Sequence, residues 1–169
     1  MKQYQKRNRL YYFAALVAIV ISTIFSVTLQ FFKGDILDSA LAGEISAAIR
    51  WIVLLLIFIL CESLFYFLYA RFTARFVTEC TKMLKQDIFK SILQRSYVSY
   101  KKHPEGWYIS KYTNEADNIK DYYFQMLPLL CEILLKIIFV SVALFLLDAR
   151  IAIFTLVLLT TQLYLPKLI

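Results

Sequence analysis

Among the charged residues inside long apolar runs, Glu62, Glu132 and Lys136 lie away from the run ends, where an ionised side chain is costly and often functional. Glu62 lies near the middle of one run, Ala47 to Tyr69. It is a candidate for the lining of a translocation path, and the alternatives are a partner for a polar group on a neighbouring helix or a carboxyl group that stays protonated. Glu132 and Lys136 are four residues apart with the acid first, the favourable order for an intrahelical ion pair. We expect this pair to be structural.

The remaining chemistry-bearing residues predict no catalytic or metal centre. His103 is the only histidine and has no neighbouring cluster of Cys, Asp or Glu, so we interpret it as a polar surface residue. Cys61, Cys80 and Cys131 fall in or near apolar segments without the spacing of a metal site or of a disulfide set. We expect them to be small core residues.

The apolar runs themselves predict an all-α membrane protein. Of the 169 residues 60% are hydrophobic and only 18% are charged, and mean hydropathy is +0.62. A soluble domain carries about 25% charged residues. The four uncharged or nearly uncharged runs cover residues 10–32, 47–69, 126–147 and 151–169. Since about 20 helical residues cross the hydrocarbon core, we expect four transmembrane helices.

The first run has a rival interpretation as a cleaved signal peptide, because Ala40-Leu41-Ala42 resembles a small-residue cleavage site. The run is longer than the ~7–15 apolar residues of a signal sequence, and a polar segment separates it from those alanines. We therefore favour a retained transmembrane helix.

Charge asymmetry predicts the orientation. The net charge is +7, and the basic residues gather before the first run and between residues 71 and 124, whereas residues 33–46 are net acidic. The positive-inside rule then places the N-terminus and residues 71–124 in the cytoplasm, and Lys167 near the end of the fourth run agrees. This explanation of the basic residues is better than nucleic-acid binding, and we expect the lipid bilayer, not nucleic acid, as a partner. The predicted location is the cell membrane.

Residues 71–124 predict a helical hairpin. No Gly or Pro occurs between Gly43 and Pro104, so the second transmembrane helix has no signal to stop at the membrane surface. An apolar residue recurs every fourth position, which lines one helix face (Phe72, Phe76, Cys80, Leu84, Ile88 and Ile92). Pro104 suits the start of a new helix, and Asn114 with Asp117 resembles an N-terminal cap for the helix that feeds the third run.

The hairpin carries a family resemblance. Residues 83–93 (MLKQDIFKSIL), the glycine at 106 and residues 110–115 (SKYTNE) stand in the order seen in the exporter-type membrane domain of ATP-binding cassette (ABC) transporters. The short connection 147–150 before an apolar fourth run is also similar to that family. The resemblance implies a six-helix membrane domain of which this chain holds the first four helices, so that it would be a truncated product or a fragment.

The resemblance also implies partners and a contact site. A nucleotide-binding domain, which would hold ATP and Mg²⁺, and a second transporter half, identical or different, are the expected protein partners. The hairpin tip would dock on the nucleotide-binding domain, with Gly106 permitting a close approach or an unusual backbone angle and with aromatic residues as anchors. The interface residues are Pro104, Glu105, Gly106, Trp107, Tyr108, Ile109, Ser110 and Lys111.

We therefore expect the membrane part of an ATP-driven exporter of a peptide, lipid or drug-like substrate, acting by alternating access. With three glycines and no G-x-x-x-x-G-K-[ST] phosphate loop, this chain is not expected to be an ATPase, and we assign it no cofactor of its own. The alternative is a small four-helix accessory or immunity protein that binds a membrane partner. A polar-lined channel is less favoured, because the charges inside the runs form no ring-like pattern.

Overall fold

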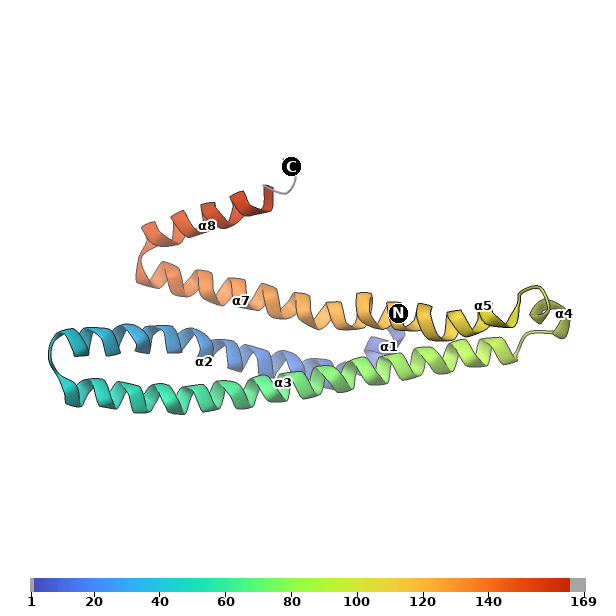
Figure 1. Ribbon diagram of the computed structural model, residues 1–169, viewed down its shortest axis with the longest axis horizontal. Helices are drawn as coiled ribbons and strands as arrows, with labels where there is room; N and C mark the ends of the chain where they lie inside the picture. Colours follow the sequence, from blue (N-terminus) through green and yellow to red (C-terminus); the bar gives the residue numbers. More distant parts are fainter. Residues whose placement is uncertain (1, 165–169) are drawn as a thin grey trace. The chain divides into compact units, whose positions relative to one another are not determined.

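A computed structural model describes residues 2–164 and shows helices connected by short turns, with no strand among these residues (Figure 1). The helices are α1 (Lys2–Arg7), α2 (Arg9–Leu41), α3 (Ile45–Leu93), α4 (Tyr97–Tyr100), α5 (Glu105–Ser110), α6 (Ala116–Ile119), α7 (Met126–Leu147) and α8 (Ala149–Tyr164). Two π-helical turns, η1 (Lys111–Glu115) and η2 (Lys120–Gln125), lie between them.

Three helical stretches are long and apolar enough to cross a membrane: Arg9–Leu41, Ile45–Leu93 and Glu105–Leu147. They contain the first three predicted transmembrane runs. The described part of the fourth run forms α8, which ends at Tyr164, and the last residues of that run, with Lys167, lie outside the described residues. The fourth transmembrane helix therefore stays a prediction.

The predicted unbroken helix is confirmed by α3, which contains 49 residues (Figure 1). The first helix also continues beyond the predicted boundary at residue 32 and ends at Leu41. It ends there because Gly43 has φ 77° and the backbone N–H groups of Glu44 and Gly43 donate to the carbonyl oxygens of Ser39 and Ala40. This is a Schellman cap, which favours glycine at the left-handed position.

The described chain forms two compact units. The first unit comprises residues Met1–Ile19 and Leu64–Glu132, and the second comprises Val20–Ser63 and Ile133–Ile169. In the second unit, α2 and the first part of α3 pack through aromatic rings. The ring of Phe58 lies 4.8 Å from that of Phe32 and 5.1 Å from that of Phe25, and both pairs meet edge to face.

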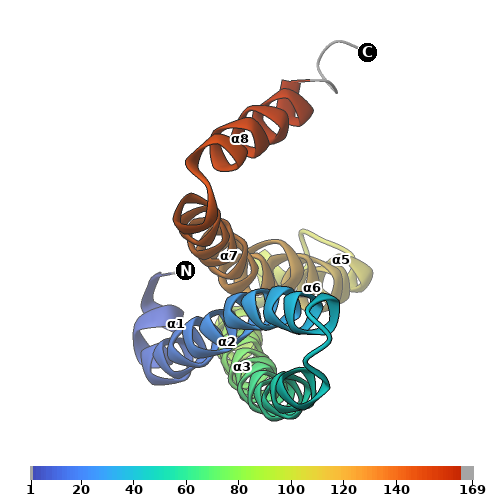
Figure 2. The ribbon, with the colours of Figure 1, turned by 90° about the vertical axis from the view of Figure 1, so that its left-hand side faces the viewer.

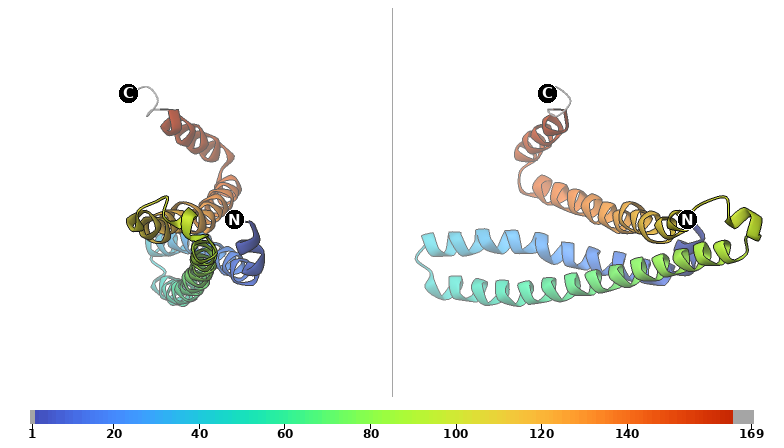
Figure 3. Two further views of the ribbon diagram at one scale, coloured as in Figure 1. Left: turned by 90° about the vertical axis from the view of Figure 1, so that its right-hand side faces the viewer. Right: turned by 45° about the vertical axis from the view of Figure 1, so that its right-hand side comes forward.

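The first unit contains the helical hairpin. Its core consists of Tyr4, Phe76, Val77, Cys80, Leu84, Ala116 and Phe124. The predicted stripe on α3 is confirmed as the packed face, since Phe76, Cys80 and Leu84 are buried and the other members are half-buried. The small helix α4 lies at the end of the hairpin, between α3 and α5 (Figure 3).

The second stem of the hairpin runs as one continuous helical stretch from Glu105 to Leu147. Four of its five buried residues, Tyr108, Ala116, Phe124 and Glu132, are spaced by eight, and the fifth, Pro128, lies midway between the last two. In an α-helix, eight residues turn about 80° beyond two full turns, so this stripe would leave the packed face. The π-turns η1 and η2 wind more residues into each turn and keep the stripe facing the core.

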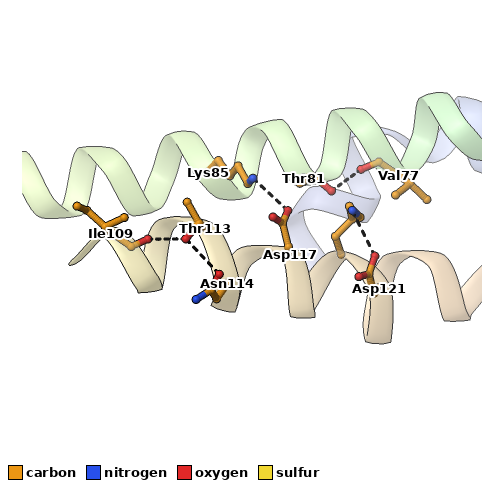
Figure 4. Close-up of polar contacts among 9 residues, drawn as sticks. Val77, Thr81, Lys85, Ile109, Thr113, Asn114, Asp117 and Asp121 are labelled. Atoms are coloured by element: carbon orange, nitrogen blue, oxygen red, sulfur yellow. Dashed lines mark hydrogen bonds and ion pairs between the residues drawn. The ribbon is translucent and has the colours of Figure 1, made fainter. Parts of the chain in front are cut away.

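The predicted helix start at Asn114 is therefore wrong. Asn114 lies inside η1 and its Nδ2 donates to Ser110 Oγ at 3.4 Å, while Asp117 Oδ1 accepts from Lys85 Nζ at 3.1 Å (Figure 4). Neither side chain caps a helix end, because the helix does not restart there. The actual start follows Pro104, whose ψ of 154° precedes α5, as the sequence predicted.

Candidate functional site

The predicted contact residues 104–111, called here the tip segment, begin the second stem. They do not form a separate docking helix, because α5 continues directly into η1. The only separate short helix at the described end of the hairpin is α4, Tyr97–Tyr100, which is capped by the hydroxyl of Ser96. The tip therefore consists of α4, the connection 101–104 and the first turns of α5 (Figure 3).

Tyr108 holds this tip together and is not an exposed anchor. It is 4% exposed, its ring stacks on that of Tyr100 at 4.7 Å and 11°, and its hydroxyl donates to the carbonyl oxygen of Tyr100 at 3.1 Å. The guanidinium of Arg95 lies 5.6 Å from the ring centre. These contacts join the end of α3, α4 and α5, so Tyr108 belongs to the tip's own core.

Trp107 is half-buried by its own neighbours. Its ring stacks on His103 with centroids 4.1 Å apart, and Lys111 Nζ lies 4.6 Å from the ring centre. His103, expected to be a polar residue of the tip, is exposed there and also stacks on Trp107. Lys111 Nζ also lies 3.4 Å from Glu115 Oε2, four residues later.

Within residues 104–111, Ile109 is the large apolar residue that is exposed. Its side chain is 63% exposed and borders a groove of about 350 Å³ between the two stems. The groove is lined by Phe89, Ile92, Tyr108, Ile109 and Tyr112. Phe89 is 54% exposed, so the groove offers two uncovered apolar side chains from different helices.

The remaining tip residues are mainly polar or small. Pro104, Glu105 and Gly106 are exposed, and Ser110 is half-exposed. The expectation of an unusual backbone angle at Gly106 is wrong, because Gly106 is helical and only Gly43 has a positive φ among the described residues. A Cβ atom at residue 106 would meet nothing within 4 Å.

The charged residues of the apolar runs lie in different environments. Glu132 is 8% exposed on α7, and Lys136, one turn later, is exposed. Their pairing and their structural role stay predictions. Glu62 is half-buried in the middle of α3, and the described residues place no hydrogen-bond or ion-pair partner on it. Its place in a translocation path stays a prediction.

The N-terminal helix α1 was not predicted from the sequence. Asn8, which follows it, is 9% exposed, and its Nδ2 lies 3.6 Å from Cys80 Sγ and 3.5 Å from Met83 Sδ. Figure 2 shows α1 turned away from the start of α2. An available signal was the spacing of Tyr4 and Asn8, which places two large polar side chains on one helix face.

The comparison with known families decides what kind of molecule contains this hairpin. The sequence pattern of the ABC transporter transmembrane region matches residues 11–169, nearly the whole chain. This chain belongs to the ABC transporter transmembrane family. The resemblance read from the hairpin motifs is thus confirmed. Comparisons with curated proteins and with solved structures found no match.

Membership makes the chain the membrane part of an ABC transporter. Such regions associate with a membrane and usually with an ATP-binding domain or a second half. The match does not favour the alternative of a four-helix accessory protein. The role of the tip residues 104–111 as the contact site of a protein partner stays a prediction.

Proposed function

We propose that the chain is part of an ABC exporter that moves a peptide, lipid or drug-like molecule out of the cytoplasm by alternating access. In this proposal the N-terminus and the hairpin are cytoplasmic, and the short connections 33–46 and 148–150 are external. The concentration of Lys and Arg in residues 71–124 supports that orientation. The transporter resides in the cell membrane.

The groove beside Ile109 is the observation that carries the proposal. It presents uncovered apolar side chains far along a helix that leaves the predicted membrane segment at residue 69, well beyond lipid contact. Exposed apolar anchors surrounded by polar residues are typical of protein interfaces. A nucleotide-binding domain that inserts into this groove would transmit its ATP-driven closure to both stems at once.

ATP and Mg²⁺ would be bound by that separate domain. The sequence contains no G-x-x-x-x-G-K-[ST] phosphate loop, so we expect the purified chain to have no ATPase activity of its own. The hydrogen bonds and stacked rings around Tyr108 would make the tip rigid, so that movement of the docked domain is passed to the stems with little loss.

The test is Ile109→Asp in the assembled transporter, reconstituted with its nucleotide-binding domain. A buried charge without a partner at an interface anchor should reduce substrate-stimulated ATPase about tenfold or more, by the loss of about 2 kcal/mol of contact energy. Leu93→Asp is the matched control, because Leu93 is 68% exposed and does not line the groove. Equal effects of the two substitutions, or no effect of either, would remove the groove from the mechanism.

A further inference from the structure

A second cavity lies where α1 and the start of α2 meet α3 and α7. Its volume is about 360 Å³, within the range of small-ligand sites. The lining residues are Gln5, Lys6, Arg9, Tyr12, Phe76 and Leu127. All six belong to the first unit. Gln5, Lys6 and Arg9 precede residue 11, where the family match begins.

The polar rim of this cavity presents hydrogen-bond donors with unused capacity. The Nε2 atom of Gln5 is buried and has no hydrogen-bond partner in the described chain. No carboxylate of residues 2–164 lies within ion-pair distance of Lys6 or Arg9. A buried amide donor without a partner costs roughly 1–3 kcal/mol, so an acceptor that enters the cavity is favoured. An ammonium and a guanidinium beside it select an anion.

The floor of the cavity is apolar and held in place. The rings of Tyr12 and Phe76 are 5.2 Å apart, and Phe76 is 1% exposed. The Tyr12 hydroxyl lies 2.9 Å from Cys131 Sγ on α7, which fixes the ring against the neighbouring helix. Leu127 completes this surface. The floor suits hydrocarbon, whereas the rim suits a phosphate group, so the complementary ligand is an anionic amphiphile.

The cavity also lies at the level where such molecules occur. Arg9 directly precedes the first transmembrane run, and Leu127 is near the start of the third. Both positions mark the cytoplasmic end of a run in the proposed orientation, on which this step rests. The cytoplasmic leaflet carries the anionic lipids, and basic residues near its surface gain about 1 kcal/mol each.

We propose that this cavity binds an anionic phospholipid of the cytoplasmic leaflet. Its phosphate accepts hydrogen bonds from Gln5 Nε2, Lys6 and Arg9, and its acyl chain lies against Phe76 and Leu127. The bound lipid thereby joins the N-terminal helix to α7, because its headgroup and its chain contact different helices.

The experiment measures lipid binding to the whole protein in detergent by native mass spectrometry, with phosphatidylglycerol as the probe and phosphatidylcholine as the neutral comparison. We expect Arg9→Gln to weaken phosphatidylglycerol binding about fivefold more than Arg7→Gln, which removes the same charge from an exposed residue outside the cavity lining. Gln5→Leu should also weaken phosphatidylglycerol binding, without lowering the stability of the lipid-free protein, since it deletes an unsatisfied donor.

Three results would overturn the proposal. Equal weakening by Arg7→Gln and Arg9→Gln would mean general surface attraction. Binding of phosphatidylcholine as tight as that of phosphatidylglycerol would mean a purely apolar groove. Displacement of the lipid by an equal concentration of glycerol phosphate would mean a site for a soluble anion. Binding in detergent does not depend on orientation, so failure here is distinguishable from failure of the proposed topology, which cysteine labelling tests separately.

Discussion

The hydroxyl of Tyr4 donates a hydrogen bond of 2.7 Å to Oδ2 of Asp87, a residue 83 positions later in the chain. It connects α1 to the middle of the α3 stem. Together with the contacts of Asn8 to Cys80 and Met83, it holds the N-terminal helix against the hairpin. The position of α1 thus depends on a few polar contacts at one end of a mainly apolar core.

We expect Tyr4→Phe to free the N-terminal helix. The substitution removes a hydrogen bond to a carboxylate at a residue only 7% exposed, and such bonds contribute about 1.5–3 kcal/mol. Local opening should become about ten times more frequent or higher, and tryptic cleavage after Lys6 and Arg7 should accelerate by the same factor. Tyr11→Phe, whose hydroxyl has no hydrogen bond within residues 2–164, is the control and should leave the cleavage rate unchanged.

Two neighbouring residues on the second stem, Ala116 and Asp117, should differ strongly in how much a substitution lowers the stability of the protein. Ala116 is fully buried against α3, so Ala116→Leu should cost about 1–3 kcal/mol or more by overpacking. Asp117, by contrast, pairs with Lys85 at side-chain exposures of 47% and 28%, and Asp117→Asn should cost less than about 1 kcal/mol (Figure 4). Thermal unfolding in detergent compares the two. A larger loss for Asp117→Asn would show that the ion pair, not the packing, joins the stems.

The thiol of Cys80 should be alkylated slowly, and its alkylation rate should continue to depend on pH where that of an ordinary thiol no longer does. Burial raises its pKa above the ordinary value of 9.0, although the amide of Asn8 opposes this shift. In a Cys61→Ala/Cys131→Ala version, the alkylation rate of the native protein should keep rising with pH above 9.0, where the denatured protein has levelled off. The unfolded thiol then loses its proton first, so stability should fall as pH rises through that range. Coincident native and denatured profiles would contradict the buried position.

The proposed topology predicts opposite labelling of two exposed positions. In a version without the native cysteines, Ala42→Cys should react with an impermeant thiol reagent applied to intact cells, whereas Lys102→Cys should react only after the membrane is opened. Both side chains are exposed, so differences in burial do not confuse the comparison. Labelling of Lys102→Cys in intact cells would reverse the orientation.

Local signals predicted much of this fold. The absence of Gly and Pro from residues 44–103 predicted α3, and the four-residue apolar stripe predicted its packed face. The burial of Tyr108 was not predicted, since its partners, Tyr100 on α4 and Arg95 in the turn after α3, form contacts with it only once the tip has folded. Large apolar residues near a turn look alike in sequence whether they pack inward, as Tyr108 does, or outward, as Ile109 does.

The false cap at Asn114 has a related cause. A capping residue is useful only at a free helix end, and its sequence pattern is the same inside a helix. Here the side-chain amide of Asn114 donates a hydrogen bond to Ser110 Oγ, and the carboxylate of Asp117 forms an ion pair with Lys85. The looser winding of this stem is visible only in the structure, where the buried residues 108, 116, 124 and 132 recur at a spacing of eight.

Those loosely wound turns have a consequence for how this stem tolerates changes in length. A π-turn holds one residue more than the α-helical turn that it replaces. Deleting a single exposed residue such as Tyr122 from η2 should therefore convert it to an α-helical turn and leave the following apolar segment in register. The same deletion in α7 would rotate everything after it by about 100°. η1 and η2 are thus the places where natural relatives of this chain can differ by one residue without losing the packed face.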